Sequence, residues 1–165
     1  GVFGPALCIG AMVGAALAHA EYAEIIPDLL HVHPGAIRTA LRCIPRLYAV
    51  TDSTAAAGMP DGDYRLGEQK VTKCLGGVRL ADGTLAGSTL TMDQALRNFV
   101  SVGLSLAEAS DRLSRFPADF LGRRDIGRLE AGARADIVTL DPELTLTSVH
   151  LDGRLVSGES HVTHA

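Results

Sequence analysis

Two histidines and an aspartate in the first third of the chain have the residue types and spacing for chemistry. His31 and His33 stand two residues apart, so in an extended segment their side chains would face the same way and could bind a metal together. Either imidazole could instead donate a hydrogen bond to a hydroxyl or phosphate oxygen of a ligand, or serve only the local structure. Asp52 could take and return a proton, although an aspartate followed by Ser53 and Thr54 is also a common cap or turn residue. The residues alone leave these alternatives open.

The segments around these side chains predict a strand, a helix and a second strand. Residues 22–26 form a short apolar run that ends at a proline, residues 36–43 have helical spacing after Pro34, and residues 47–50 are apolar again. Such a unit has parallel strands, and ligand sites lie at their carboxyl ends. We therefore expect His31 and Asp52 to lie at one ligand site, at the carboxyl ends of the two strands.

The rest of the chain alternates between sheet and helix. Residues 61–87 contain short pieces punctuated by glycine, which predicts a β insert. Thr91 with Gln94, and Ser105 with Glu108, have the spacing of helix capping boxes. The tail from about residue 135 alternates as an antiparallel sheet. These elements are too few to close an eight-stranded barrel, so the chain resembles the end of one.

Composition excludes several classes of protein. The chain has 165 residues of which 47% are hydrophobic, enough for one buried core, and its 15 Lys+Arg and net charge of −4 argue against a nucleic-acid partner. The three cysteines Cys8, Cys43 and Cys74 show no CxxC spacing, which favours buried, reduced thiols in a cytoplasmic protein. The first twenty residues are uncharged, but without a basic flank we expect a buried or badly packed soluble segment and no membrane span.

Four stretches of sequence together resemble one enzyme family, the N-acetylglucosamine-6-phosphate deacetylases of the amidohydrolase superfamily. The resemblance covers roughly residues 14–156, and its most specific parts are the first three stretches. The stretches are DLLHVHP at 28–34, VTD with AAAG at 50–58, DGTLAGS with LTM at 82–92, and GARADIV at 132–138.

The resemblance implies an α/β fold that is the C-terminal portion of a metal-dependent-hydrolase (β/α)8 (TIM) barrel, plus part of a small β-sandwich domain. Residues 1–130 would be the partial barrel with a β insert near 61–87. Residues 131–165 would be strands of the small β domain.

The same resemblance implies hydrolysis of the acetamide of N-acetylglucosamine 6-phosphate to glucosamine 6-phosphate and acetate. Asp52 corresponds to the family's general base and acid, and His31 to a histidine that contacts the sugar phosphate. Asp28 lies in the same substrate-contacting loop. Leu85, Ala86 and Gly87 match a loop whose backbone approaches the substrate near its amide group.

The resemblance also implies a divalent metal, zinc or iron, and a homodimer. The family's metal ligands should lie upstream of Gly1, so we expect no metal site in this chain and no activity from it alone. The family's phosphate-binding arginine, which acts across the dimer, has no counterpart near residues 8–11. Two alternatives stay open: another amidohydrolase, or a non-catalytic remnant of a truncated gene.

Overall fold

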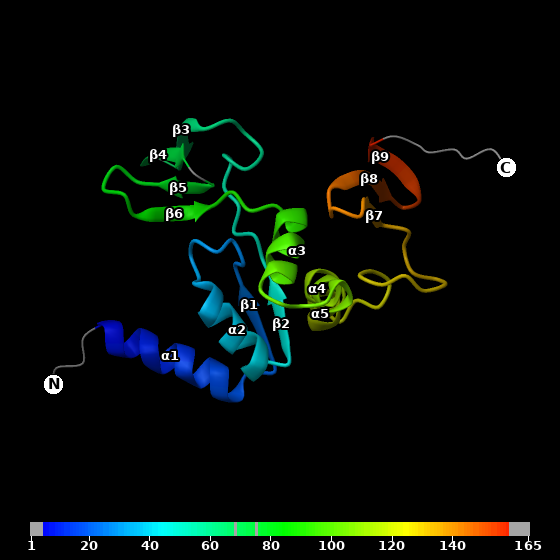
Figure 1. The fold of residues 1–165 in the computed structure, drawn as a ribbon, viewed down its shortest axis with the longest axis horizontal. Helices are drawn as coiled ribbons and strands as arrows, with labels where there is room; N and C mark the ends of the chain where they lie inside the picture. Colours follow the sequence, from blue (N-terminus) through cyan, green and yellow to red (C-terminus); the bar gives the residue numbers. More distant parts are fainter. Residues whose placement is uncertain (1–4, 68, 75, 159–165) are drawn as a thin grey trace. The chain divides into compact units, whose positions relative to one another are not determined.

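The computed structural model describes residues 5–67, 69–74 and 76–158, which divide into two compact units, one up to Leu113 and one from Ser114 (Figure 1). The first unit holds most of the elements. In chain order they are α1 (Pro5–His19), β1 (Tyr22–Ile25), α2 (Pro34–Cys43), β2 (Arg46–Ala49), β3 (Gly62–Leu66), β4 (Gln69–Cys74), β5 (Gly77–Arg79), β6 (Leu85–Ser88), α3 (Met92–Ser101) and α4 (Leu106–Leu113).

The expected strand, helix and parallel strand are confirmed. β1 pairs with β2 in parallel, with Tyr22 opposite Arg46 and Ile25 opposite Ala49. The helix between them, α2, begins after His33, whose Nδ1 accepts a hydrogen bond from the Gly35 N–H at 3.0 Å. Prolines suit the first turn of a helix because the missing N–H has no intrahelical partner there. This unit sets the direction of the two strands whose ends carry the candidate residues.

The β insert is an antiparallel sheet in the order β3-β4-β5-β6. Its core is formed by Ala56, Val71 and Val78. The β insert expected over residues 61–87 is confirmed, and residues 85–87, which match a loop in the resembling family, form most of strand β6 at its end. The Gly83 N–H donates to Leu80 O in a tight turn, so the returning chain pairs with β5 and satisfies its backbone groups there.

Only one of the two expected capping boxes forms. The Ser105 hydroxyl and N–H both donate to Glu108 Oε2, at 2.7 and 3.0 Å, at the start of α4. Thr91 precedes α3 without a side-chain cap bond. The Asp93 carboxylate instead takes hydrogen bonds from the Thr91 side chain and from the Gln94 N–H, which is the group that the box would cap. The Gln94 side chain does not reach back either, since its Nε2 donates to Asn98 Oδ1 at 2.8 Å. The expected box at Thr91 is therefore wrong.

The difference between these two caps gives a testable expectation. Replacing Ser105 with Ala should lower the free energy of unfolding by about 1 kcal/mol, because it removes a formed helix cap. Thr91→Ala, the matched control on α3, should cost clearly less. Chemical denaturation of the two variants checks this, and equal losses would contradict the structure of the caps.

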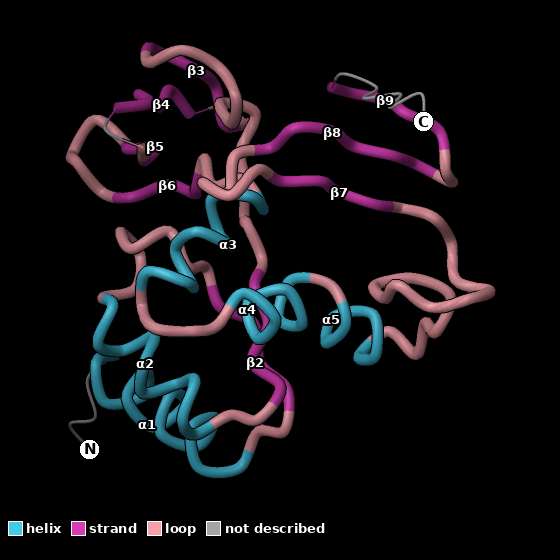
Figure 2. Tube along the Cα trace, turned by 45° about the vertical axis from the view of Figure 1, so that its right-hand side comes forward, coloured by secondary structure: helices cyan, strands magenta, loops and turns pink. Residues whose placement is uncertain are grey.

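The first helix and the cysteines bear on two further expectations. α1 runs beside α2 (Figures 1 and 2), but residues 11–15 are exposed, with Met12 at 76% exposure, so of the two expected alternatives this apolar segment is the badly packed one and not the buried one. Within the described residues, no helix is both long and apolar enough to cross a membrane. Cys43 is a free and exposed thiol rather than a buried one, and Cys74 is half-buried. The side chain of Cys8 lies outside what the structure describes.

The second unit contains one short helix and an antiparallel sheet. Its elements are α5 (Arg115–Phe120), β7 (Ile137–Leu140), β8 (Leu146–Leu151) and β9 (Arg154–Gly158). β8 lies between β7 and β9 in the sheet, which agrees with the antiparallel tail expected from the sequence. The short helix α5 was not expected. A domain boundary near residue 130 stays a prediction.

Candidate active site

Asp52 follows β2 at the carboxyl end of the parallel pair. The Val50 N–H donates to Ile25 O at 2.9 Å, which carries the pairing one residue beyond the strand ends. Just past this point a hollow of about 520 Å³ is lined by side chains from both strand ends, namely Glu24, Ile25, Ile26, Val32, Val50 and Asp52. Asp52 is exposed, and its carboxylate makes no hydrogen bond or ion pair with the described part of the chain. A proton acceptor is thus open to a ligand at this mouth.

The carboxyl end of β6, at Gly87 and Ser88, lies beside the segment that follows Asp52. The Ser88 N–H donates to Asp52 O at 3.1 Å, and the Thr54 N–H donates to Ser88 O at 2.9 Å, so the two segments meet in an isolated parallel bridge between Ser53 and Ser88. Gly87 has φ +105°, and a Cβ there would lie 2.5 Å from Thr54 Cγ2. Only glycine allows this close approach without a shift.

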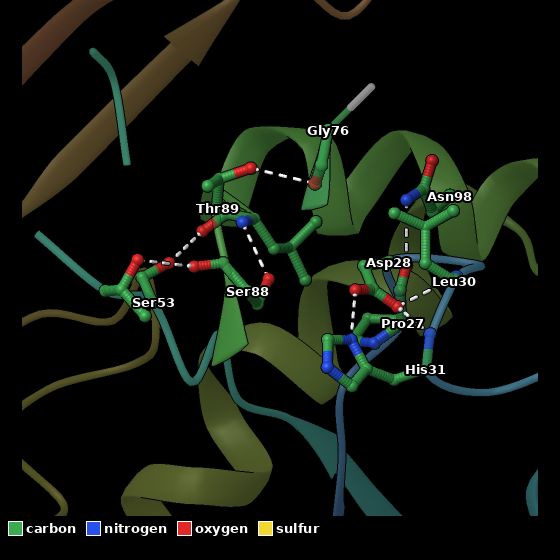
Figure 3. Close-up of polar contacts among 11 residues, drawn as sticks. Pro27, Asp28, Leu30, His31, Ser53, Gly76, Ser88, Thr89 and Asn98 are labelled. Atoms are coloured by element: carbon green, nitrogen blue, oxygen red, sulfur yellow. Dashed lines mark hydrogen bonds and ion pairs between the residues drawn. The ribbon is translucent and has the colours of Figure 1, made fainter. Parts of the chain in front are cut away.

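Asp28 and His31 form a compact hydrogen-bonded unit in the loop after β1 (Figure 3). Asp28 Oδ1 accepts from the N–H groups of Leu30 at 3.0 Å and His31 at 2.9 Å, and Oδ2 lies 2.6 Å from His31 Nδ1. Burial raises the pKa of the Asp28 carboxyl, but the hydrogen bonds from the His31 ring and from these main-chain groups outweigh it, and the pKa lies below its ordinary value. An ionised carboxylate therefore faces the imidazole.

The proposed metal pair of His31 and His33 gains no support from the contacts. Nδ1 of His31 faces Asp28, and Nδ1 of His33 caps α2, so each ring serves its own local structure. Across residues 5–67, 69–74 and 76–158, no three His, Cys, Asp or Glu side chains gather closely enough to hold a metal ion. Because a catalytic divalent metal such as zinc uses about three protein ligands, these residues do not by themselves fit such a centre.

Two buried polar residues that position the site were missed from the sequence. Ser88 is fully buried, and its Oγ accepts from the Leu90 N–H at 2.8 Å, beside the pairing with Asp52. Asn98 of α3 is 8% exposed, and its Nδ2 donates to Pro27 O at 2.7 Å. The sequence offered one signal for Asn98: it is a polar residue on the apolar face of a helix. The structure buries Ala95 and Phe99 on that same face.

The loop that carries Asp28 also borders a second hollow. Its volume is about 420 Å³ and its lining is Asp28, Leu30, Gly76, Thr89, Leu90, Thr91, Gln94 and Asn98. Thr89 Oγ1 donates to Gly76 O at 2.9 Å across its edge (Figure 3). Since Val32 lines the first hollow and Asp28 the second, residues 28–32 lie at the border of both.

Comparisons with known proteins give one consistent family. The model of the Amidohydrolase family matches residues 26–160. A relative from Escherichia coli (strain K12), described as a putative N-acetylgalactosamine-6-phosphate deacetylase, is 43% identical over 88% of this chain and 90% of that protein. The solved N-acetylglucosamine-6-phosphate deacetylase of Thermotoga maritima is 36% identical, with a TM-score of 0.82 over 88% of this chain.

A further solved structure contains a substrate. It is a mutant N-acetyl-D-glucosamine-6-phosphate deacetylase of Mycobacterium smegmatis, with one aspartate replaced by alanine, in complex with N-acetyl-D-glucosamine-6-phosphate. This chain is 40% identical to it, with a TM-score of 0.74. The chain spans 41% of the Thermotoga protein and 37% of the Mycobacterium protein, but 90% of the Escherichia coli relative.

Proposed function

The chain belongs to the amidohydrolase family, and from this premise we propose that it carries the proton shuttle and part of the substrate surface of an N-acetylglucosamine-6-phosphate deacetylase. The observation that supports this most is the exposed carboxylate of Asp52 at the carboxyl ends of two parallel strands. Active sites of α/β barrels lie at that end of the strands. Gly87 lies against the same segment, and the loop with His31 follows the neighbouring strand.

The reaction assigns a definite proton path to Asp52. As water attacks the acetamide carbonyl, Asp52 accepts a proton from it. The C–N bond then breaks, and Asp52 returns the proton to the leaving nitrogen, giving acetate and glucosamine 6-phosphate. Amidohydrolases generally use a divalent metal, and we place the ligands of zinc or iron outside the described residues, which do not complete such a site.

The substrate contacts follow from the loops at the mouth. His31 would contact the sugar phosphate through the ring nitrogen that Asp28 leaves free, and the backbone of Leu85, Ala86 and Gly87 would approach the amide group. We further propose that the first unit is the end of a (β/α)8 barrel, that the terminal strands are part of a small β-sandwich domain, and that the complete enzyme is a cytoplasmic homodimer.

A second candidate substrate is the 4-epimer, N-acetylgalactosamine 6-phosphate. The specific observation is that the Escherichia coli relative named for this sugar is 43% identical, against 36% and 40% for the two solved enzymes named for the glucosamine compound. Both sugars carry the acetamide that Asp52 would act on, so the shuttle is the same for either. The contacts to the sugar hydroxyls decide between them.

A pair of assays tests the function. The 165-residue chain alone should bind less than one zinc or iron ion per chain and release no acetate, because its described residues form no three-ligand cluster. A chimera in which this chain replaces the matching part of the Thermotoga maritima enzyme should bind the metal and release acetate.

Elemental analysis and acetate release from both epimers are the measurements. The ratio of kcat/KM for the two sugars identifies the natural substrate, because that ratio measures discrimination between them. A folded, metal-loaded chimera that hydrolyses neither sugar would overturn the proposed function. One metal ion per isolated chain, with turnover, would show that the chain completes the site by itself.

A further inference from the structure

The Asp28 carboxylate is almost fully buried, and both of its oxygens already bond to the chain itself. Its side chain is 4% exposed, Oδ1 accepts two main-chain N–H groups, and Oδ2 faces the imidazole of His31 at 2.6 Å. We infer that Asp28 is a positioning residue that fixes the orientation and the protonated nitrogen of His31, rather than a residue that touches the substrate.

The hydrogen bonds determine which ring nitrogen carries the proton. Both Oδ1 partners are main-chain donors, which hold the carboxylate in one rotamer with Oδ2 directed at His31 Nδ1 (Figure 3). A carboxylate can only accept, so Nδ1 must be the donor and Nε2 is left with its lone pair in the neutral ring. The lowered pKa of Asp28 agrees with a carboxylate that stays ionised in this contact.

The loop that carries Asp28 and His31 is bonded to α3 at its first residues. Asn98 Nδ2 donates to the carbonyl of Pro27, which is fully buried, and Asn98 Oδ1 accepts from Gln94 Nε2 at 2.8 Å. Because both ends of the Asn98 amide are engaged, the amide cannot rotate without losing two bonds. Asp28 therefore projects from a fixed point, as a residue that orients another must.

The functional consequence rests on the proposed function, in which His31 contacts the sugar phosphate. With the proton fixed on Nδ1, neutral Nε2 accepts from a sugar hydroxyl, and protonated Nε2 donates to a phosphate oxygen. An amide at position 28 would present its NH2 group to Nδ1 and so move the proton of the neutral ring to Nε2. Asp28→Asn thus reverses the donor and acceptor sides of the ring while the two main-chain bonds to Oδ1 persist.

Nitrogen-15 NMR of the intact chain reads the tautomer directly. The chain has 6 histidines, so the His31 signals are assigned as those missing from His31→Gln. At the alkaline end of a pH series, the wild-type chain should show the proton on Nδ1 and Asp28→Asn should show it on Nε2. Asp93→Asn, on α3 and outside this unit, is the control that should leave the His31 signals unchanged.

Kinetics in the chimera add a second readout. Asp28→Asn should raise KM by about tenfold or more and leave kcat within about threefold, because a charge-assisted contact made by His31 is lost from substrate binding. A wild-type chain with the proton on Nε2 overturns the inference, even if the variant does not fold. If the tautomer changes as expected but no chimera hydrolyses either sugar, the positioning role stands and the proposed function fails.

Discussion

Asp52→Asn in the chimera should lower turnover by about 10²-fold or more while the sugar phosphate still binds with a nearly unchanged KM. The amide keeps the shape of the carboxylate but cannot take the proton of the attacking water. Because the Asp52 backbone, and not its side chain, pairs with Ser88, the substitution should leave the local structure intact. Initial rates of acetate release against substrate concentration give both constants.

The matched control for this prediction is Asp61→Asn. Asp61 is also an exposed aspartate of the first unit but lines neither hollow, so its variant should keep turnover within about twofold. Circular dichroism establishes that both variants fold. If Asp52→Asn keeps turnover within a few-fold of the unsubstituted chimera, Asp52 is not the proton shuttle, whatever the resemblance implies.

The position of the candidate site could be predicted because it follows from chain direction. Two apolar runs separated by a helical segment give parallel strands, and parallel strands place the residues after them at one edge. Asp52 and His31 follow those runs, and of the two only Asp52 lines the hollow at the strand ends, so a meeting of His31 with Asp52 stays a prediction. No contact between distant residues had to be known for this step.

The supporting residues could not be predicted because their partners are backbone atoms far away in the sequence. Asn98 and Pro27 are 71 residues apart, and a side chain that bonds a carbonyl leaves no complementary residue type in the sequence. The failed cap at Thr91 has a different, local cause, because the Asp93 carboxylate takes the Gln94 N–H and the Gln94 side chain bonds Asn98 one turn along the same helix. Local patterns show what a side chain could do, and the competing partners decide what it does.

The second large effect, on both stability and turnover, should come from Gly87→Ala, which disrupts the contact between β6 and the segment that follows Asp52. The positive φ of +105° strains any residue with a Cβ, at about 1–3 kcal/mol. The new Cβ would also lie 2.5 Å from Thr54 Cγ2, and overpacking of this kind costs about 1–3 kcal/mol more. We expect the free energy of unfolding to fall by about 2–6 kcal/mol, and turnover of the chimera to fall because the bond from Ser88 to Asp52 is displaced.

Two further variants separate strain from clash. Gly83→Ala is the control for strain alone, because Gly83 has φ +86° with nothing within 4 Å of its Cβ position, so it should lose only about 1–3 kcal/mol. Thr54→Ser removes the methyl group that the new Cβ would meet, so Gly87→Ala should cost less in that background than in the parent. Urea unfolding of the four corners of this cycle measures the difference. Equal costs in both backgrounds would mean that Thr54 does not press on Gly87, and that the close approach of β6 to the Asp52 segment is not what requires glycine.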